Sequence, residues 1–152
     1  MHPSRLGRGE VIAVVGAVLL AGGLFLPWYK TNPTNHNATI DGARGSLTGW
    51  DVHHILRWPL LLAAAAPIVL AYIVVRDHDL SWPRGEMTAV LAMIALVLIL
   101  YVGVISRPGQ PPGEIALRLG WFAAALGALL ECSGGALRAG TTERPRKPPG
   151  VL

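Results

Sequence analysis

Four apolar runs constrain the fold of this 152-residue chain more than any other feature of its sequence. They lie between charged residues, and only the last of them is interrupted, by Glu131. An α-helix needs about 20 mostly apolar residues to cross the hydrocarbon core of a bilayer. The sequence therefore predicts four membrane-spanning helices, over residues 10–29, 57–75, 87–106 and 118–137.

The composition agrees with a membrane protein and argues against several other classes. Hydrophobic residues make up 52% of the chain and charged residues only 14%, whereas soluble domains carry about 25% charged residues. A disordered chain needs low hydrophobicity and high net charge, and a soluble enzyme needs more surface charge than this. The basic residues lie between the apolar runs, which indicates contact with a membrane and not with nucleic acid.

The spans define one domain, residues 1–139, which we expect to be an all-α membrane protein folded as a four-helix transmembrane bundle. The first span could alternatively be a cleaved signal peptide, with the small residues 21–23 as its cleavage site. Retention as a helix is favoured because the apolar run continues as far as Trp28 and Tyr29. Residues 140–152 are rich in proline and basic side chains, so they predict a disordered cytoplasmic tail.

The connection between the first two spans, residues 30–54, is the only sizeable loop. It contains Asp41-Gly42, a frequent hairpin turn, between short stretches that include Ile40 and Leu47. The loop therefore predicts a small β-hairpin. An isolated hairpin is marginally stable in water, so this one has to pack against the ends of the helices.

The distribution of positive charge predicts how the bundle is oriented. Eight of the 13 Lys and Arg residues lie in the two terminal segments and the middle loop, and the others lie in the first and third loops. Cytoplasmic segments carry the excess of Lys and Arg in membrane proteins. We therefore expect a multi-pass protein of the plasma (inner) membrane, with both termini in the cytoplasm and the loop 30–54 outside.

Two further sets of residues follow from the span pattern. Small side chains let membrane helices approach closely, and they predict packing faces, within the bundle or in a dimer, at Gly16, Gly120, Ala124, Gly127 and Ala128. Aromatic side chains near the ends of the first two spans predict anchors at the membrane interface. These are Trp28, Tyr29, Trp50 and Trp58.

Glu131 is the only acidic residue inside an apolar run. Ionisable groups inside a membrane are costly and usually face a bundle interior or a water-filled cavity. One hypothesis is that Glu131 pairs with a basic residue at the end of a neighbouring span. The other is that it couples the movement of a proton or a cation.

Asp51, His53 and His54 are the densest group of chemically active side chains. Carboxylate and imidazole are suitable ligands for zinc or copper, and histidine can also respond to pH. Their spacing matches no strong metal signature, and Asp51 can instead serve as the N-cap of the second span. We therefore expect no metal and no cofactor, with these three residues as the metal candidates.

The remaining signals point away from catalysis. The sequence has no phosphate-binding loop, nucleophile elbow, HExxH motif or CxxC pair. We predict no catalytic residues and a non-enzymatic protein, an accessory or scaffolding subunit of a membrane complex. Its partners would be the lipid bilayer and another membrane protein or a second copy. The alternative is a small proton- or cation-coupled carrier, channel-like in form, that uses Glu131.

Two short motifs carry a resemblance. At LPWY (26–29) and SLTGWD (46–51), the chain resembles small uncharacterised four-span membrane proteins common in actinobacteria. The resemblance covers the whole layout and implies no biochemical activity. The layout around the first loop is also similar to claudin-like proteins. That family has a cysteine pair in this loop, whereas Cys132 is the single cysteine here.

Overall fold

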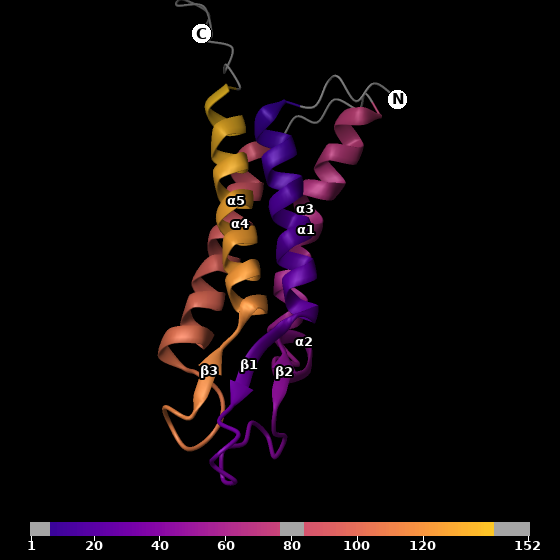
Figure 1. Cartoon of the computed structure of the whole chain (residues 1–152). Coiled ribbons are helices and arrows are strands. Elements are labelled where there is room, and N and C mark those ends of the chain that lie inside the picture. The colour runs from indigo at the N-terminus through magenta and orange to yellow at the C-terminus, as the bar shows by residue number, and fades with distance from the viewer. Residues whose placement is uncertain (1–6, 77–83, 142–152) are drawn as a thin grey trace, which may run out of the picture.

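The computed structural model describes residues 7–76 and 84–141. Four of its helices are long and apolar enough to cross a membrane, which confirms the four helices predicted from the apolar runs. A small sheet and a helical turn form a cap at one end of the bundle (Figure 1). In chain order the elements are α1 (Arg8–Phe25), β1 (Pro27–Thr31), β2 (Ser46–Thr48), α2 (Gly49–Val52), α3 (Arg57–Val75), α4 (Arg84–Leu100), the π-helical turn η2 (Tyr101–Ile105), β3 (Ile115–Leu117) and α5 (Leu119–Thr141).

The ends of two predicted spans are wrong. The first span ends at Phe25 and not at residue 29, because Pro27 disfavours helical backbone at Leu26, which is extended (φ −86°, ψ 158°). The last span continues to Thr141, so residues 140 and 141 belong to a helix and not to the predicted tail. The rest of that tail, residues 142–152, lies outside the described residues.

Helices α1 and α5 pack with their backbones in contact. A Cβ atom built on Gly16 would lie 2.5 Å from the backbone nitrogen of Glu131, and one on Gly23 would lie 2.7 Å from that of Ala124. Toward the chain termini, a Cβ atom on Gly134 would lie 2.5 Å from the carbonyl oxygen of Gly9. Glycine is therefore required along the whole length of this helix pair.

Helix α5 makes a second close contact, with α4. A Cβ atom on Gly85 would lie 2.6 Å from the carbonyl oxygen of Gly135, and one on Gly135 would lie 2.7 Å from the nitrogen of Ala89. Helix α3 instead packs mainly against α1 and α4. Thus α5 is the central helix of the bundle.

The outer surface of the bundle is apolar. Large hydrophobic side chains are exposed on every long helix, among them Val18 (61%), Leu62 (64%), Val97 (60%) and Leu129 (51%). The buried face is instead built largely from glycine and alanine. This distribution is typical of helices that are surrounded by lipid and held together by close backbone packing.

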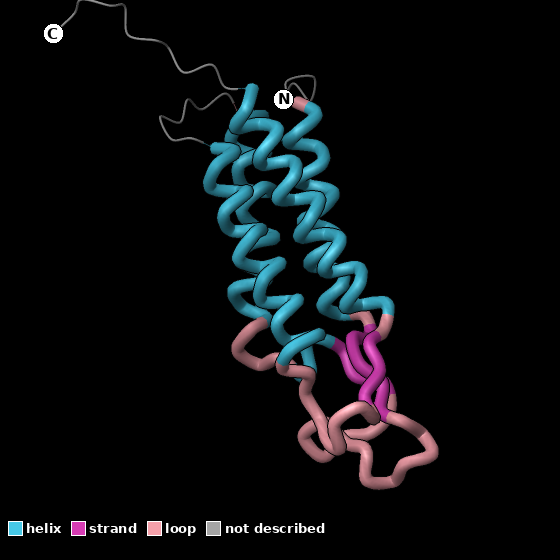
Figure 2. Tube along the Cα trace, turned by 90° about the vertical axis from the view of Figure 1, so that its left-hand side faces the viewer, coloured by secondary structure: helices cyan, strands magenta, loops and turns pink. Residues whose placement is uncertain are grey.

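The cap extends the α1–α5 pair beyond the bundle (Figure 2). Its sheet has the order β2-β1-β3, and β1 pairs antiparallel with β3 through Tyr29 and Leu117, and through Thr31 and Ile115. Strand β1 follows α1 directly, and β3 directly precedes α5. We call this continuous pair of segments, α1–β1 and β3–α5, the spine.

The predicted hairpin in the first loop is correct only at its turn. Asp41 and Gly42 both have positive φ (48° and 79°), and Ile40 and Ala43 form a bridge across them. The sheet does not form across this turn. Strand β2 pairs instead with β1, and the first three residues of β1 belong to the predicted first span. Moreover, Thr39 forms a bridge with Gln110 of the third loop.

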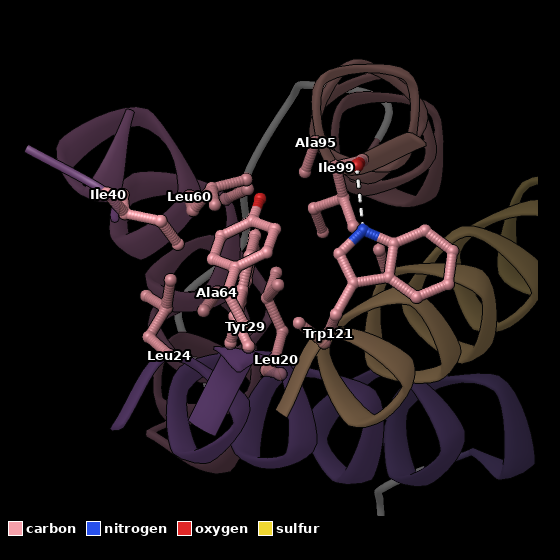
Figure 3. Close-up of a cluster of buried hydrophobic side chains, with 14 of the residues drawn as sticks. Leu20, Leu24, Tyr29, Ile40, Leu60, Ala64, Ala95, Ile99 and Trp121 are labelled. Atoms are coloured by element: carbon pink, nitrogen blue, oxygen red, sulfur yellow. Dashed lines mark hydrogen bonds between the residues drawn. The ribbon is translucent and has the colours of Figure 1, made fainter. Parts of the chain in front are cut away.

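Tyr29 and Trp121 fill the space where the bundle meets the cap (Figure 3). Tyr29 is fully buried together with Leu20 and Leu60. The Trp121 Nε1–H group donates a 2.9 Å hydrogen bond to the Ile99 carbonyl oxygen. The indole also packs against Gly103, where α4 has given way to η2. One side chain of α5 thereby fixes the end of α4.

Candidate functional site

Glu131 is fully buried in the middle of α5, with an exposed fraction of 0%. Its backbone lies against Gly16 of α1. Within the described part of the chain, neither carboxyl oxygen has a hydrogen-bond partner. A buried polar group without a partner is costly and rare in native proteins, so Glu131 is the strongest functional candidate in the bundle.

The hypothesis that Glu131 pairs with a basic residue at the end of a neighbouring span is wrong, because neither of its carboxyl oxygens has a partner among the described residues. Arg138, two helical turns further along α5, forms an ion pair with Glu10 of α1. The other oxygen of Glu10 accepts a 2.6 Å hydrogen bond from the Gly7 amide, at the start of α1. The structure therefore ties the ends of the two helices together through Glu10 and leaves Glu131 out.

A small cavity lies beside the Glu10–Arg138 ion pair. It is lined by this pair and by Pro67 of α3, Thr88 of α4 and Gly134 of α5, among others, and its volume is about 20 Å³. This is enough for one water molecule. Glu131 does not line the cavity, although Gly134, which does, follows it by one helical turn.

The arrangement has a defined chemical capacity. Carboxyl groups that face a bundle interior are the groups that proton relays and cation pathways use. Glu131 can hold a proton or accept a cation. The geometry therefore identifies a fully buried carboxyl that is chemically able to bind either.

The three metal candidates do not converge. The Asp51 carboxylate accepts a 2.6 Å hydrogen bond from Thr48, His53 points into the cap, and His54 is exposed. No group of three metal-binding side chains occurs among the described residues. Asp51 is also not the N-cap of the second span, because it lies in α2, where Thr48 is the N-cap, and α3 begins only at Arg57.

His53 instead takes part in a partly buried hydrogen-bond chain that joins the cap to the bundle. The Tyr29 hydroxyl donates to the Val102 carbonyl oxygen (3.3 Å), so its oxygen is left to accept from Nε2–H of His53 (2.9 Å). Burial lowers the pKa of His53 to about 4, against a smaller opposing effect of Asp41 and a further lowering by His54. Burial likewise raises the pKa of Tyr29 above its ordinary value, and Arg107 opposes this. Both rings are therefore neutral near pH 7.

The four predicted interface anchors divide into two pairs. Trp28 and Tyr29 are wrong as anchors, because both are fully buried in β1. Trp28 donates a 2.8 Å hydrogen bond to the Gly23 carbonyl oxygen. Trp50 and Trp58 form an edge-to-face pair with ring centroids 5.9 Å apart, and Trp58 is 58% exposed. Only this second pair lies at the outer surface, at the start of α3.

An arginine completes that aromatic surface. The Arg57 guanidinium lies over Trp50, 4.6 Å from the ring centroid, and 5.3 Å from that of Trp58. Phe25 stacks on the other side, with its centroid 5.1 Å from that of Trp50. Aromatic rings and basic groups gather at the headgroup level of membrane proteins, so this cluster marks the level where the bundle meets the cap.

The predicted helix-packing residues all lie on buried faces. Gly16 and Gly127 face each other across the α1–α5 contact, and Gly120 lies against the Leu26 carbonyl. Ala124 and Ala128 are completely buried. Sequence reasoning missed the ion pair of Glu10 with Arg138. In the sequence, each residue marks the boundary of its own span, and opposite charges at the ends of two antiparallel spans are the signal that could have found the pair.

Comparisons with protein-family models, with curated proteins and with solved structures give no match for this chain. The candidate site therefore rests on the geometry of these residues.

Proposed function

We propose that this chain is a non-enzymatic integral membrane protein that serves as an accessory or scaffolding subunit of a complex in the plasma (inner) membrane. Both termini lie in the cytoplasm and the cap lies outside, in agreement with the distribution of Lys and Arg. The observation that carries the proposal is the spine, which links the Glu10–Arg138 end of the bundle to the cap through elements that follow each other directly in the chain.

The spine supports a scaffold for a physical reason. Backbone contact along α1 and α5 leaves these helices little room to slide. Beyond the helices, the Arg118 amide donates a 2.8 Å hydrogen bond to the Trp28 carbonyl oxygen, and β1 and β3 then continue the pairing. Interfaces bind best when their surfaces are fixed before association. A rigid spine fixes both the lipid-facing helices and the cap for a partner.

Purification of the tagged protein in mild detergent, with native mass determination, tests this proposal. A scaffold is expected to retain a partner protein at fixed stoichiometry, and to keep it after Glu131→Gln. Gly120→Leu is expected to lose the partner, because a Cβ atom at this position would lie 2.5 Å from the Leu26 carbonyl oxygen. A monomer or a homo-oligomer without another protein would contradict the accessory role.

A second candidate function is a proton- or cation-coupled carrier. The observation that favours it is the fully buried Glu131 carboxyl without a hydrogen-bond partner. In proteoliposomes, a carrier is expected to acidify or alkalinise the lumen under a membrane potential, and Glu131→Gln is expected to abolish this flux while the protein stays folded. Glu114→Gln is the matched control, because Glu114 lies in the cap and its replacement can still accept the Asn32 hydrogen bond. Equal flux in wild type and Glu131→Gln would exclude the role.

A further inference from the structure

A basic hollow lies at the outer end of the cap, away from the helices. Its walls are formed by Lys30 and Thr31 at the end of β1, by Pro33, and by Arg44 and Gly45 just before β2. Its volume is about 320 Å³, at the lower end of the range for small-molecule sites, about 300–1,000 Å³. The hollow has no part in the spine or in the Glu131 site.

The backbone fixes the two sides of the hollow relative to each other. Thr31 donates its amide to the Gly45 carbonyl oxygen (3.0 Å), and the Gly45 amide donates to the Thr31 hydroxyl oxygen (2.8 Å). Gly45 has φ of 97°, which an L-residue rarely adopts. This reciprocal pair of bonds places Arg44 across from Lys30, although the two are far apart in the sequence.

The two cations of the hollow have no anionic partner. Throughout residues 7–76 and 84–141, neither Lys30 nor Arg44 forms an ion pair with a carboxylate, and no acidic residue lines the hollow. The single polar side-chain contact of Arg44 is with Nδ1 of His36, at 3.3 Å. Of the loop carboxylates, Glu114 is held by the Asn32 side-chain amide at 2.5 Å, and Asp41, three residues before Arg44, does not line the hollow. Two like charges that share one hollow repel each other unless an anion lies between them.

The chemistry of the pair selects among anions. Arginine presents a planar fork of donors that matches the oxygen atoms of a phosphate group, and lysine adds a mobile point charge. A phosphate monoester carries about −1.5 to −2 charges at pH 7 and can neutralise both side chains, whereas a carboxylate neutralises only one.

The position of the hollow selects the source of the phosphate. Strand β1 runs from the end of α1 away from the bundle, and at about 3.3 Å per residue Lys30 lies roughly 15 Å beyond Phe25. The headgroup layer is only about 5–8 Å thick on each side of a bilayer. The hollow therefore faces the aqueous phase beyond the lipid headgroups.

We infer that this hollow is an anion site that binds a phosphate group of a water-borne ligand between Lys30 and Arg44. The inference does not depend on the scaffold proposal or on Glu131, because it uses only the geometry of the cap and its height above the lipid headgroups. It adds a ligand site at the end of the molecule opposite to the Glu10–Arg138 pair.

Titration of the full-length protein in phosphatidylcholine nanodiscs with inorganic phosphate, followed by calorimetry, tests the inference. We expect saturable binding that weakens at least tenfold in Lys30→Gln and in Arg44→Gln, and at least tenfold weaker binding of acetate. Arg118→Gln removes an exposed positive charge from the same end of the molecule without touching the hollow, so it is the matched control and should retain phosphate binding.

Each alternative outcome overturns the inference. Absence of saturable phosphate binding would exclude the site, and an equal loss in Arg118→Gln would reduce it to unspecific attraction by net charge. Equal affinities for acetate and phosphate would contradict the claim that the hollow prefers a phosphate group. Phosphate binding that disappears in phosphatidylglycerol nanodiscs, at 0.15 M salt, would show that lipid headgroups occupy the hollow. Arg44 is exposed, so Arg44→Gln should fold normally, and an unchanged melting temperature is the check.

Discussion

At the scale of single residues, Glu131 makes a large unfavourable contribution to the stability of the bundle. Glu131 is fully buried and without a hydrogen-bond partner among the described residues, whereas Glu10 and Arg138, nearer the end of the bundle, form an ion pair. The unpaired carboxyl therefore lowers the stability of the folded protein. Two predictions about single residues follow.

Replacement of Glu131 by methionine is expected to stabilise the protein. Methionine has a similar size and removes an unpaired buried polar group, whose cost is about 1–3 kcal/mol. In a chain of this length, each kcal/mol corresponds to a shift of about 2–4 °C in Tm. Scanning fluorimetry in detergent should show a higher Tm for Glu131→Met and a lower Tm for Glu10→Gln, which removes the ion pair between Glu10 and Arg138. A lower Tm for Glu131→Met would show that Glu131 has a stabilising partner.

His53 should make the cap sensitive to acid. Its pKa is about 4 in the folded protein, chiefly because it is buried, and its ordinary value is 6.5. The unfolded chain therefore binds more protons between these values, so the stability contributed by neutral His53 is present above pH 6.5 and is lost as the pH falls toward 4. The Tm, measured at a series of pH values from 8 to 4, should fall less steeply with decreasing pH in His53→Gln than in wild type. The neighbouring exposed His54 is the control, and His54→Gln should follow the wild-type curve. Parallel curves for wild type and His53→Gln would contradict the buried assignment.

At the scale of elements, the helices could be predicted from the sequence and the sheet could not. Apolar runs locate α1, α3, α4 and α5 because a membrane-spanning helix satisfies all its backbone hydrogen bonds within itself. The sequence places the first part of β1 in the first span, because Trp28 and Tyr29 extend its apolar run. Periodicity does not separate a short buried strand from a helix end. The pairing of Tyr29 with Leu117 joins distant segments, and no local pattern reports it.

The same limit applies to the candidate site. The position of Glu131 within an apolar run was visible in the sequence, and its burial followed from the cost of exposing a carboxyl to lipid. Its lack of a partner depends on which face of α5 meets α1. The same contact brings Glu10 to Arg138. Both facts follow from the packing of helices that are distant in the sequence, so they cannot be predicted from the individual spans.

Two glycines of α1 provide a matched test of the spine. A Cβ atom on Gly16 would lie 2.5 and 2.6 Å from backbone atoms of α5, whereas nothing lies within 4 Å of one on Gly22. Gly16→Ala should therefore force the helices apart and destabilise the protein by about 1–3 kcal/mol. Gly22→Ala should be neutral, or stabilising by up to about 1 kcal/mol, because alanine favours helix. Thermal or SDS unfolding measures both. Equal effects of the two substitutions would refute backbone contact between α1 and α5.

At the scale of the whole molecule, the spine joins three chemically different regions. The Glu10–Arg138 pair lies at one end, the buried Glu131 lies within the bundle, and the basic hollow of Lys30 and Arg44 lies at the far end of the cap. The apolar outer surface of the long helices surrounds the middle region. We propose that a membrane surrounds this surface and separates the cap from the Glu10–Arg138 end, and the proposed functions depend on that separation or on the spine.

Cysteine accessibility in intact cells tests this architecture most directly. With Cys132→Ser as background, Asn37→Cys places a thiol at an exposed position of the cap, and Gly140→Cys places one at the open end of α5. A membrane-impermeant maleimide should label position 37 in intact cells and position 140 only after the membrane is permeabilised. Labelling of both positions in intact cells would contradict a membrane-spanning bundle, and labelling of position 140 alone would place the cap in the cytoplasm.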